Sequence, residues 1–332
     1  MNLSSFNRRH FMKSIPVAAS TLSLASFSAE ETKAPSKSLV VEVHRPGITD
    51  ENNRPDPAGV QEMLDKAMYE FTGETSRRDQ WARYISKEDV VGLKVNGLGG
   101  PRLSTKTELI NAVIKGLLEL GVKENNIIIW EDREMCIKSF GMPENMGDTG
   151  IRVCRTDHPS IGWDEEELVF GSIRANISKI LTRQITAMIN LPIMKDHCFS
   201  GSTLSLKNIS HGITNRSGKF HTDHCNPFIA EVNATPVVQK KYRITILDAF
   251  QGCFDKGPEF HPGCTYNYDS LYIAIDRVAL DTIGTIRVEA ARQEKNLLPL
   301  AEDNRPPDYI AQAANLGLGT NEPEKIEHRK LE

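Results

Sequence analysis

The chain has 332 residues, of which 39% are hydrophobic and 25% are charged, and its formal net charge at pH 7 is −4. This length and composition suit an ordinary globular protein of one or two domains. The slightly acidic balance gives no reason to expect binding to nucleic acid or to an anionic membrane surface. No stretch approaches the roughly 20 consecutive apolar residues of a membrane-spanning helix, so we expect the mature form not to span a membrane.

The N-terminus has the arrangement of an export signal. Paired arginines lie in "NRRHFMK" (7–13), and a short, mildly apolar segment rich in Ala and Ser follows at 14–29. A charged region, an apolar region and small residues, in this order, are typical of a signal peptide. The stretch resembles the twin-arginine signal apart from Asn7 and Met12, which implies the twin-arginine translocation machinery as a partner and a periplasmic or otherwise exported location. We expect a signal peptide at 1–29, a linker at 30–37 and a single α/β domain at 38–332.

Short β-rich segments alternate with helical patterns in the first half of the mature chain. The clearest helix contains Thr105 and Glu108 at capping-box spacing, and Gly121 is a favourable residue for its end. In chain order, the predicted elements are a strand at 38–43, a helix at 57–71, a strand at 89–96, a helix at 104–121, a strand at 126–131, a further helix, and a strand at 151–156.

The alternation continues in the second half, where Asp276 is the expected N-cap of the last long helix. Strands of continuous Ile, Val and Leu character between amphipathic helices are typical of an α/β fold with a doubly wound, mainly parallel sheet and helices on both faces. Ligands of such sheets bind at the carboxyl ends of the strands, so we expect residues 195–240 to line the site. The predicted elements are a helix at 172–183, strands at 185–191, 242–250 and 270–275, and a helix at 276–295.

Histidines are concentrated in this region. Four of the nine histidines in the chain are His197, His211, His221 and His224. Imidazole is a common ligand of zinc-like ions, so we expect His197, with His221 or His224, to bind a divalent metal ion, and Asp223 and Cys225 are further candidate ligands. His221 and His224 would share one face if they lay on a helix. Alternatively, these histidines are polar loop residues without a metal, because no HExxH or similar motif is present.

Lysines and amides indicate an anionic ligand. Lys195 directly follows a buried type of strand, and Lys207 forms an i,i+4 pair with His211 if "LSLKNISHG" is helical. We predict Lys195 and Lys207 as catalytic residues and Asn208 and His211 as substrate-binding residues, because a desolvated lysine can hold an anion or act as a base. An exposed basic face is the alternative.

Two other strand ends carry candidate residues. Lys94 and Asn96 end the strand before the glycine-rich segment 97–102, and we expect both to contact the substrate. The helix that follows could bind an anion with its backbone N–H groups. Asp248 lies near the end of the strand at 242–250 and is the third predicted catalytic residue, as a base, a metal ligand or the partner of a histidine.

Several short motifs, read in order, resemble the family called domain of unknown function 362, over roughly residues 88–290. They are "GLKVN" (92–96), "NLPIMKDH" (190–197), "LKNISHG" (206–212), histidines near 221–224, "ILDAF" (246–250), "KGP" (256–258) and "DRVALD" (276–281). The resemblance implies an α/β fold and a site that contains Lys195, His197, Lys207, Asn208, Gly212, one of His221 and His224, and the acidic residues Asp248, Asp276 and Asp281.

Some relatives carry an attached iron–sulfur segment. The six cysteines of this chain form no CxxC pair, so an iron–sulfur cluster is not expected. An oxidising compartment would permit a disulfide between Cys253 and Cys264.

The leading hypothesis is an exported, metal-assisted enzyme that acts on a small anion, and the alternative is a periplasmic binding or carrier protein without catalysis.

Overall fold

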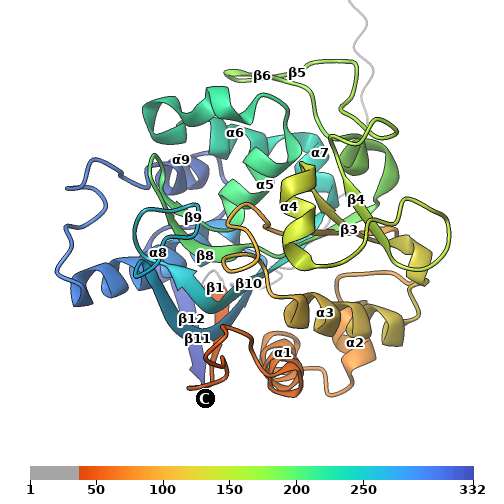
Figure 1. The fold of residues 1–332 in the computed structure, drawn as a ribbon, viewed down its shortest axis with the longest axis horizontal. Coiled ribbons are helices and arrows are strands. Elements are labelled where there is room, and N and C mark those ends of the chain that lie inside the picture. The colour runs from red at the N-terminus through yellow and green to blue at the C-terminus, as the bar shows by residue number, and fades with distance from the viewer. Residues whose placement is uncertain (1–36) are drawn as a thin grey trace, which may run out of the picture. The chain divides into compact units, whose positions relative to one another are not determined.

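A computed structural model describes residues 37–332, so the predicted signal peptide and nearly all of the linker lie outside the described residues. The described part is built on one ten-stranded sheet, viewed in Figure 1. Its order is β12-β1-β11-β10-β7-β2-β3-β4, and β8 and β9 extend it beside β10. The strands are β1 (Ser38–His44), β2 (Val91–Lys94), β3 (Ile127–Glu131), β4 (Arg152–Arg155), β7 (Ala187–Asn190), β8 (Ile193–His197), β9 (Gly201–Thr203), β10 (Tyr242–Cys253), β11 (Thr265–Ala274) and β12 (Ile326–Leu331).

Most strand pairs of this sheet are parallel. The continuous run β10-β7-β2-β3-β4 is parallel throughout, and β1 also pairs with β12 in parallel. Antiparallel pairs occur where β11 joins β1 and β10 and where β9 joins β8. A separate two-stranded ribbon contains β5 (Leu168–Phe170) and β6 (Ile173–Ala175).

Helices cover both faces of the sheet because its strands are apolar on both sides. In β3, Ile127 and Ile129 pack with the cluster of α1, α2 and α3, whereas Ile128 and Trp130 pack with the cluster of α5, α6 and α7. Such two-sided burial is typical of a mainly parallel α/β sheet. The predicted fold class is therefore confirmed. The α-helices are α1 (Pro57–Thr72), α2 (Arg77–Ala82), α3 (Thr107–Leu120), α4 (Glu134–Ile137), α5 (Ser205–Ile213), α6 (Phe228–Ala234), α7 (Pro236–Lys241), α8 (Arg277–Glu294) and α9 (Tyr309–Asn315).

Helix ends follow the sequence signals in two places and depart from them in a third. Gly121 ends α3 in the left-handed conformation at φ 103°, and Asp276 caps α8 through the N–H groups of its first turn. The predicted capping box of α3 is absent. Thr105 instead donates its hydroxyl to Leu191 O and accepts from Asn96 N, so it joins β2 to the segment that follows β7.

The predicted helix at 172–183 is wrong. Residues 173–175 form β6, and a π-helical turn, Ile180–Gln184, follows. Tertiary partners override the helical pattern here: Ile177 forms a β-bridge with Thr214, and Asn176 pairs with Asn215 through side chain and backbone.

The described residues contain all six cysteines of the chain. All six cysteines are free thiols, so the disulfide considered between Cys253 and Cys264 is not formed. Within residues 37–332, no helix combines the length and the apolar character that crossing a membrane requires.

Candidate functional site

The candidate site lies where the parallel strands β2, β3 and β7 end and α5 begins. Lys94, the last residue of β2, is in register with Trp130 of β3 and Asn190 of β7. Asn190 is in register with Thr245 of β10. Parallel strands bring their carboxyl ends to one edge, and this geometry gathers polar side chains from segments far apart in sequence.

A chain of buried amides forms the floor of the site. Lys195 donates to Oδ1 of Asn96 at 2.7 Å, and Asn96 donates to Asn208 at 2.9 Å. Asn208 in turn donates to Asn190 at 2.8 Å, and Asn190 donates to the Ser205 hydroxyl at 3.0 Å. Each of these amides is oriented by a specific neighbour, so the network holds β2, β7 and α5 in one arrangement.

A buried ion pair forms a second part of the site. Lys94 Nζ lies 2.9 Å from Glu131 Oε2, and the two side chains are 1% and 5% exposed. Glu131 also accepts from the backbone N–H groups of Gly97 and Asp132. Glu131 is not among the residues predicted from the sequence, although it ends the predicted strand at 126–131 and also ends β3, whereas Asp248 lies in the interior of β10.

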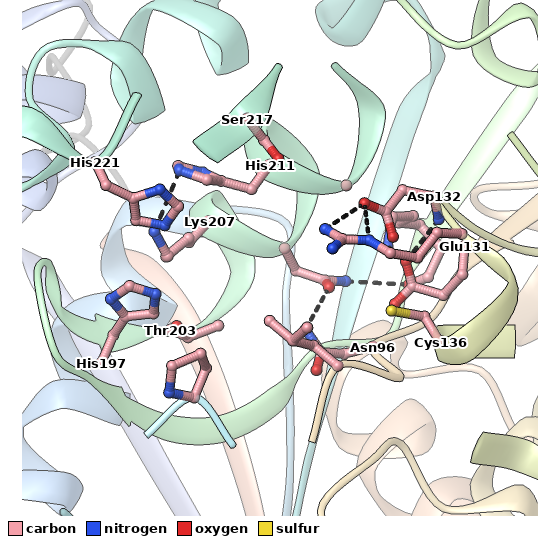
Figure 2. Close-up of a pocket in the computed structure, with 16 residues that line it drawn as sticks. Asn96, Glu131, Asp132, Cys136, His197, Thr203, Lys207, His211, Ser217 and His221 are labelled. Atoms are coloured by element: carbon pink, nitrogen blue, oxygen red, sulfur yellow. Dashed lines mark hydrogen bonds and ion pairs between the residues drawn. The ribbon is translucent and has the colours of Figure 1, made fainter. Parts of the chain in front are cut away.

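These groups surround a small cavity of about 80 Å³, shown in Figure 2. This volume has room for about two or three water molecules, or for one small ion. The lining is formed mainly by β2, β3, β8, β9, α5 and the segment after α5. The polar side chains of the lining include Lys94, Asn96, Glu131, His197, Thr203, Lys207, Asn208, His211 and His221.

Lys207 is the buried cation of this cavity. Its Nζ lies 3.3 Å from His211 Nε2 and 3.2 Å from Cys225 Sγ, and no carboxylate of the described residues forms an ion pair with it. The i,i+4 pairing of Lys207 and His211 on a helix, expected from the sequence, is present in α5. Burial lowers the pKa of Lys207 to about 8, because the ammonium loses its hydration.

His197 offers a proton to the cavity. Its Nδ1 accepts from the backbone N–H groups of Phe199 and Ser200, at 3.0 and 3.4 Å. Burial, together with the charge of Lys207, holds its pKa well below 6.5, so the ring is neutral. In the neutral ring one nitrogen accepts and the other donates, and the proton is therefore on Nε2. The ring stacks on His221 with centroids 5.3 Å apart.

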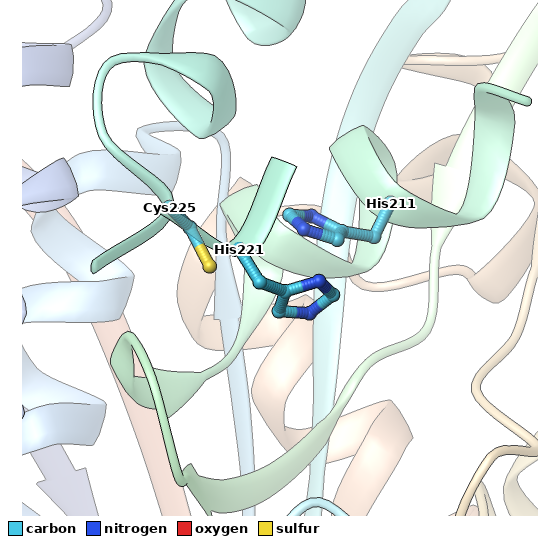
Figure 3. Close-up of side chains that lie close together, drawn as sticks. All are labelled: His211, His221 and Cys225. Atoms are coloured by element: carbon cyan, nitrogen blue, oxygen red, sulfur yellow. The ribbon is translucent and has the colours of Figure 1, made fainter. Parts of the chain in front are cut away.

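His211, His221 and Cys225 form a cluster that could hold a metal ion (Figure 3). Their ligand atoms all lie within 4.8 Å of one another. His224 is elsewhere: its Nδ1–H donates to Phe199 O at 3.0 Å, and it is not a lining residue of the cavity.

The backbone conformation of segment 217–225 explains why Cys225, and not His224, lies beside His211 and His221. His221 and His224 do not share a helical face as expected, because Asp223, His224 and Cys225 have left-handed φ angles of 48°, 57° and 65°. This turn brings the Cys225 side chain into the interior, whereas His224 stays partly exposed. No local pattern in the sequence predicts three consecutive left-handed residues without glycine.

Two predicted catalytic residues lie behind the cavity wall rather than in it. Lys195 is buried against Asn96 and Leu103 O, and burial lowers its pKa to about 8. Asp248 accepts from the Lys106 backbone N–H at 2.6 Å, so its carboxylate occupies the helix start where an anion was expected. Burial raises the pKa of Asp248 to about 6.

The family model "Domain of unknown function (DUF362)" matches residues 91–285, more than half of the chain. The chain belongs to the DUF362 family. Every residue that lines the cavity falls within the matched range, so the site is built from the part of the chain that defines the DUF362 match.

Comparison with other proteins adds little to the DUF362 assignment. A crystal structure of a Thermotoga maritima protein, solved as a structural genomics target, has 14% sequence identity and a TM-score of 0.40. The alignment covers 73% of this chain and 60% of that one. No curated protein matches the chain.

Proposed function

We propose that this DUF362 protein is an exported enzyme that binds a small anion, of carboxylate or phosphate chemistry, in the cavity at the end of β2, β3 and β7. The observation that carries this proposal is a set of three buried donors without an acceptor. The acceptor that they lack is a negatively charged one: the Lys207 ammonium contacts His211 and Cys225 but no carboxylate of the described residues, and the Nε2–H of His197 faces the cavity beside it. The third donor is the hydroxyl of Thr203, whose Oγ1 has no hydrogen-bond partner among the described residues.

A buried ammonium without a carboxylate partner and a buried hydroxyl without any partner are both costly, so their presence on one side of a cavity is a reason to expect an anionic acceptor there. Figure 2 places His197, Thr203 and Lys207 together at one end, on β8, β9 and α5. An anion would receive charge-assisted hydrogen bonds from Lys207 in a region with little water. Asn96 and Asn208 would position these donors through the amide network, and Lys94 is neutralised by Glu131.

For turnover, we assign proton transfer to Lys207, because it touches the cavity and has no carboxylate partner. Asp248 and Lys195 act as positioning residues, since neither lines the cavity.

A binding protein without turnover is the second candidate. It is favoured by the volume of about 80 Å³, which admits an ion but little of a larger substrate.

The test is thermal unfolding with sulfate, phosphate, formate and acetate. At 100 times its Kd, a bound anion stabilises the fold by about 2.7 kcal/mol, which raises the Tm by a few degrees. We expect this shift for at least one of the four anions in the wild type and its loss in Lys207→Met. Lys240→Met, at an exposed position of α7, is the matched control and should keep the shift.

Equal shifts in the wild type and in Lys207→Met, or no shift with any of these anions, would show that the cavity does not bind anions through Lys207. For the anion that binds, NMR of the mixture over time separates the two candidates. A product that forms with the wild type and not with Lys207→Met identifies an enzyme, and an unchanged anion identifies a binder.

A further inference from the structure

His211, His221 and Cys225 present a donor set that suits a zinc-like ion. Two imidazole nitrogens and one sulfur, all within 4.8 Å of one another, come from α5 and from the segment after it. In a tetrahedral site with bonds of about 2.0–2.3 Å, the ligand atoms are separated by roughly 3.5 Å, so a small inward movement would complete the geometry. Carboxylates are absent from this set, which disfavours magnesium and calcium.

The hydrogen bonds of the two rings leave the same nitrogen available on each. Nδ1 of His221 faces Gly218 O at 3.3 Å, and a carbonyl can only accept, so Nδ1 carries the proton and Nε2 has the lone pair. Nδ1 of His211 faces the Ser210 hydroxyl at 3.1 Å, while its Nε2 accepts from Lys207. A histidine that binds a metal commonly donates its other N–H to a carbonyl or similar partner.

His197 has the opposite arrangement. Its Nδ1 accepts from backbone N–H groups, so its Nε2 carries the proton and has no lone pair for a metal. The proposed ligand set therefore differs in part from the one expected from the sequence: His221 and the further candidate Cys225 are retained, whereas His211, expected to bind substrate, takes the place of His197.

Lys207 indicates that the cluster attracts positive charge. Its ammonium contacts both His211 Nε2 and Cys225 Sγ, which are two of the three ligand atoms. A cation already occupies part of the space that a metal ion would take. A metal ion and the Lys207 ammonium would compete for the same two lone pairs, and the adjoining cavity gives the lysine end room to move away.

We propose that His211 Nε2, His221 Nε2 and Cys225 Sγ form a binding site for a zinc-like divalent ion, with Lys207 as a built-in competitor. On binding, the Cys225 thiol releases its proton to solvent and the thiolate bonds to the metal. Three protein ligands leave the fourth position of a tetrahedral ion free for water or substrate, which is the arrangement of catalytic rather than structural zinc. The site does not depend on anion binding, so the two proposals can fail separately.

Cobalt is the probe, because a Co²⁺–thiolate bond gives a charge-transfer absorption that reports on Cys225 directly. The experiment titrates Co²⁺ into tag-free, reduced protein, and Zn²⁺ should then remove the band. We expect one equivalent of bound Co²⁺ with this band in the wild type. Lys207→Met should bind roughly tenfold more tightly, because one charge-assisted contact no longer competes.

Substitutions at His221 and Cys225 test two of the proposed ligands one at a time. Cys225→Ser should lose the thiolate band, and His221→Gln, at a partly exposed position, should weaken binding at least tenfold with the fold intact by circular dichroism. His224→Ala is the matched control and should bind like the wild type. The proposal is overturned if neither the wild type nor Lys207→Met shows the band, or if the band survives in Cys225→Ser or requires His224.

Discussion

At the scale of single residues, Asp281 shows how a buried carboxylate organises the site from outside it. Its two oxygens accept from the backbone N–H groups of Ser205 and Leu206, so it satisfies the start of α5, the helix that carries Lys207 and Asn208. The motif resemblance marked Asp281 as a site residue. In the structure, Asp281 does not act in the cavity but stabilises the start of α5 through these two hydrogen bonds.

Asp281 should make stability depend on pH. Burial raises its pKa from 3.8 to about 7, so between these values the unfolded chain loses this proton and the folded chain keeps it. Stability from this group is therefore lost as pH rises from about 4 to 7, by an amount on the order of 3 kcal/mol. Asp281→Asn removes the titration, so its deficit in unfolding free energy relative to the wild type should shrink across this range.

Urea denaturation at several pH values measures this difference. Asp308→Asn, which changes an exposed carboxylate, serves as control and should give a curve parallel to that of the wild type. A parallel curve for Asp281→Asn as well would mean that Asp281 is ionised in the folded protein already at pH 4.

At the scale of elements, the site depends on how closely α5 approaches β2. Gly212 of α5 lies against the Lys94 side chain, and a Cβ at this position would be 2.5 Å from Lys94 Nζ. Lys94 cannot easily move away, because Glu131 and Val95 O hold its ammonium. Glycine at this point of the helix is therefore explained by packing rather than by helix termination, since α5 continues to Ile213.

Gly212→Ala should destabilise the protein although alanine is the better helix former. Helix propensity favours alanine by up to about 1 kcal/mol, while overpacking costs typically about 1–3 kcal/mol. We expect a net loss in the free energy of unfolding in urea. Gly218→Ala is the matched control, because nothing lies within 4 Å of the added Cβ. A stabilised Gly212→Ala protein would show that Lys94 is mobile and that the close approach is not required.

At the scale of the whole molecule, the two ends of the domain pair with each other. β1 at residues 38–44 is in parallel register with β12 at residues 326–331, so Val41 lies opposite Arg329. The sheet is complete only after the last residues of the chain are available. We propose export by the twin-arginine route, which carries folded proteins, on the resemblance of residues 7–29 to its signal.

The paired arginines should decide the location of the protein. Replacing both by lysine, Arg8→Lys with Arg9→Lys, should leave folded protein in the cytoplasm of a bacterium that has the twin-arginine machinery, whereas the wild type should reach the periplasm. Cell fractionation measures both. A host without the machinery is the control and should retain the wild type. Periplasmic protein from the double variant would contradict export by this pathway.

Much of the fold follows from periodic patterns that are local in the chain. The apolar strands, the long helices and the cap at Asp276 were readable because each depends on residues a few positions apart. Polar residues at strand ends pointed to the site for a similar reason, and the structure brings Lys94, Asn96, Lys207, Asn208 and His211 to one cavity. The segment 172–183 was misread because its partners, Thr214 and Asn215, lie outside any local window.

The sequence by itself determined the α/β class, the order of most strands along the chain and the region that would carry the polar groups. Only the tertiary structure decided which groups meet. Glu131 neutralises Lys94, Asp248 caps a helix instead of lining the cavity, and the left-handed turn at 223–225 brings Cys225 rather than His224 beside His211 and His221. The reason is physical: burial patterns repeat locally, whereas proton positions, ion pairs and ligand sets depend on neighbours that only folding brings together.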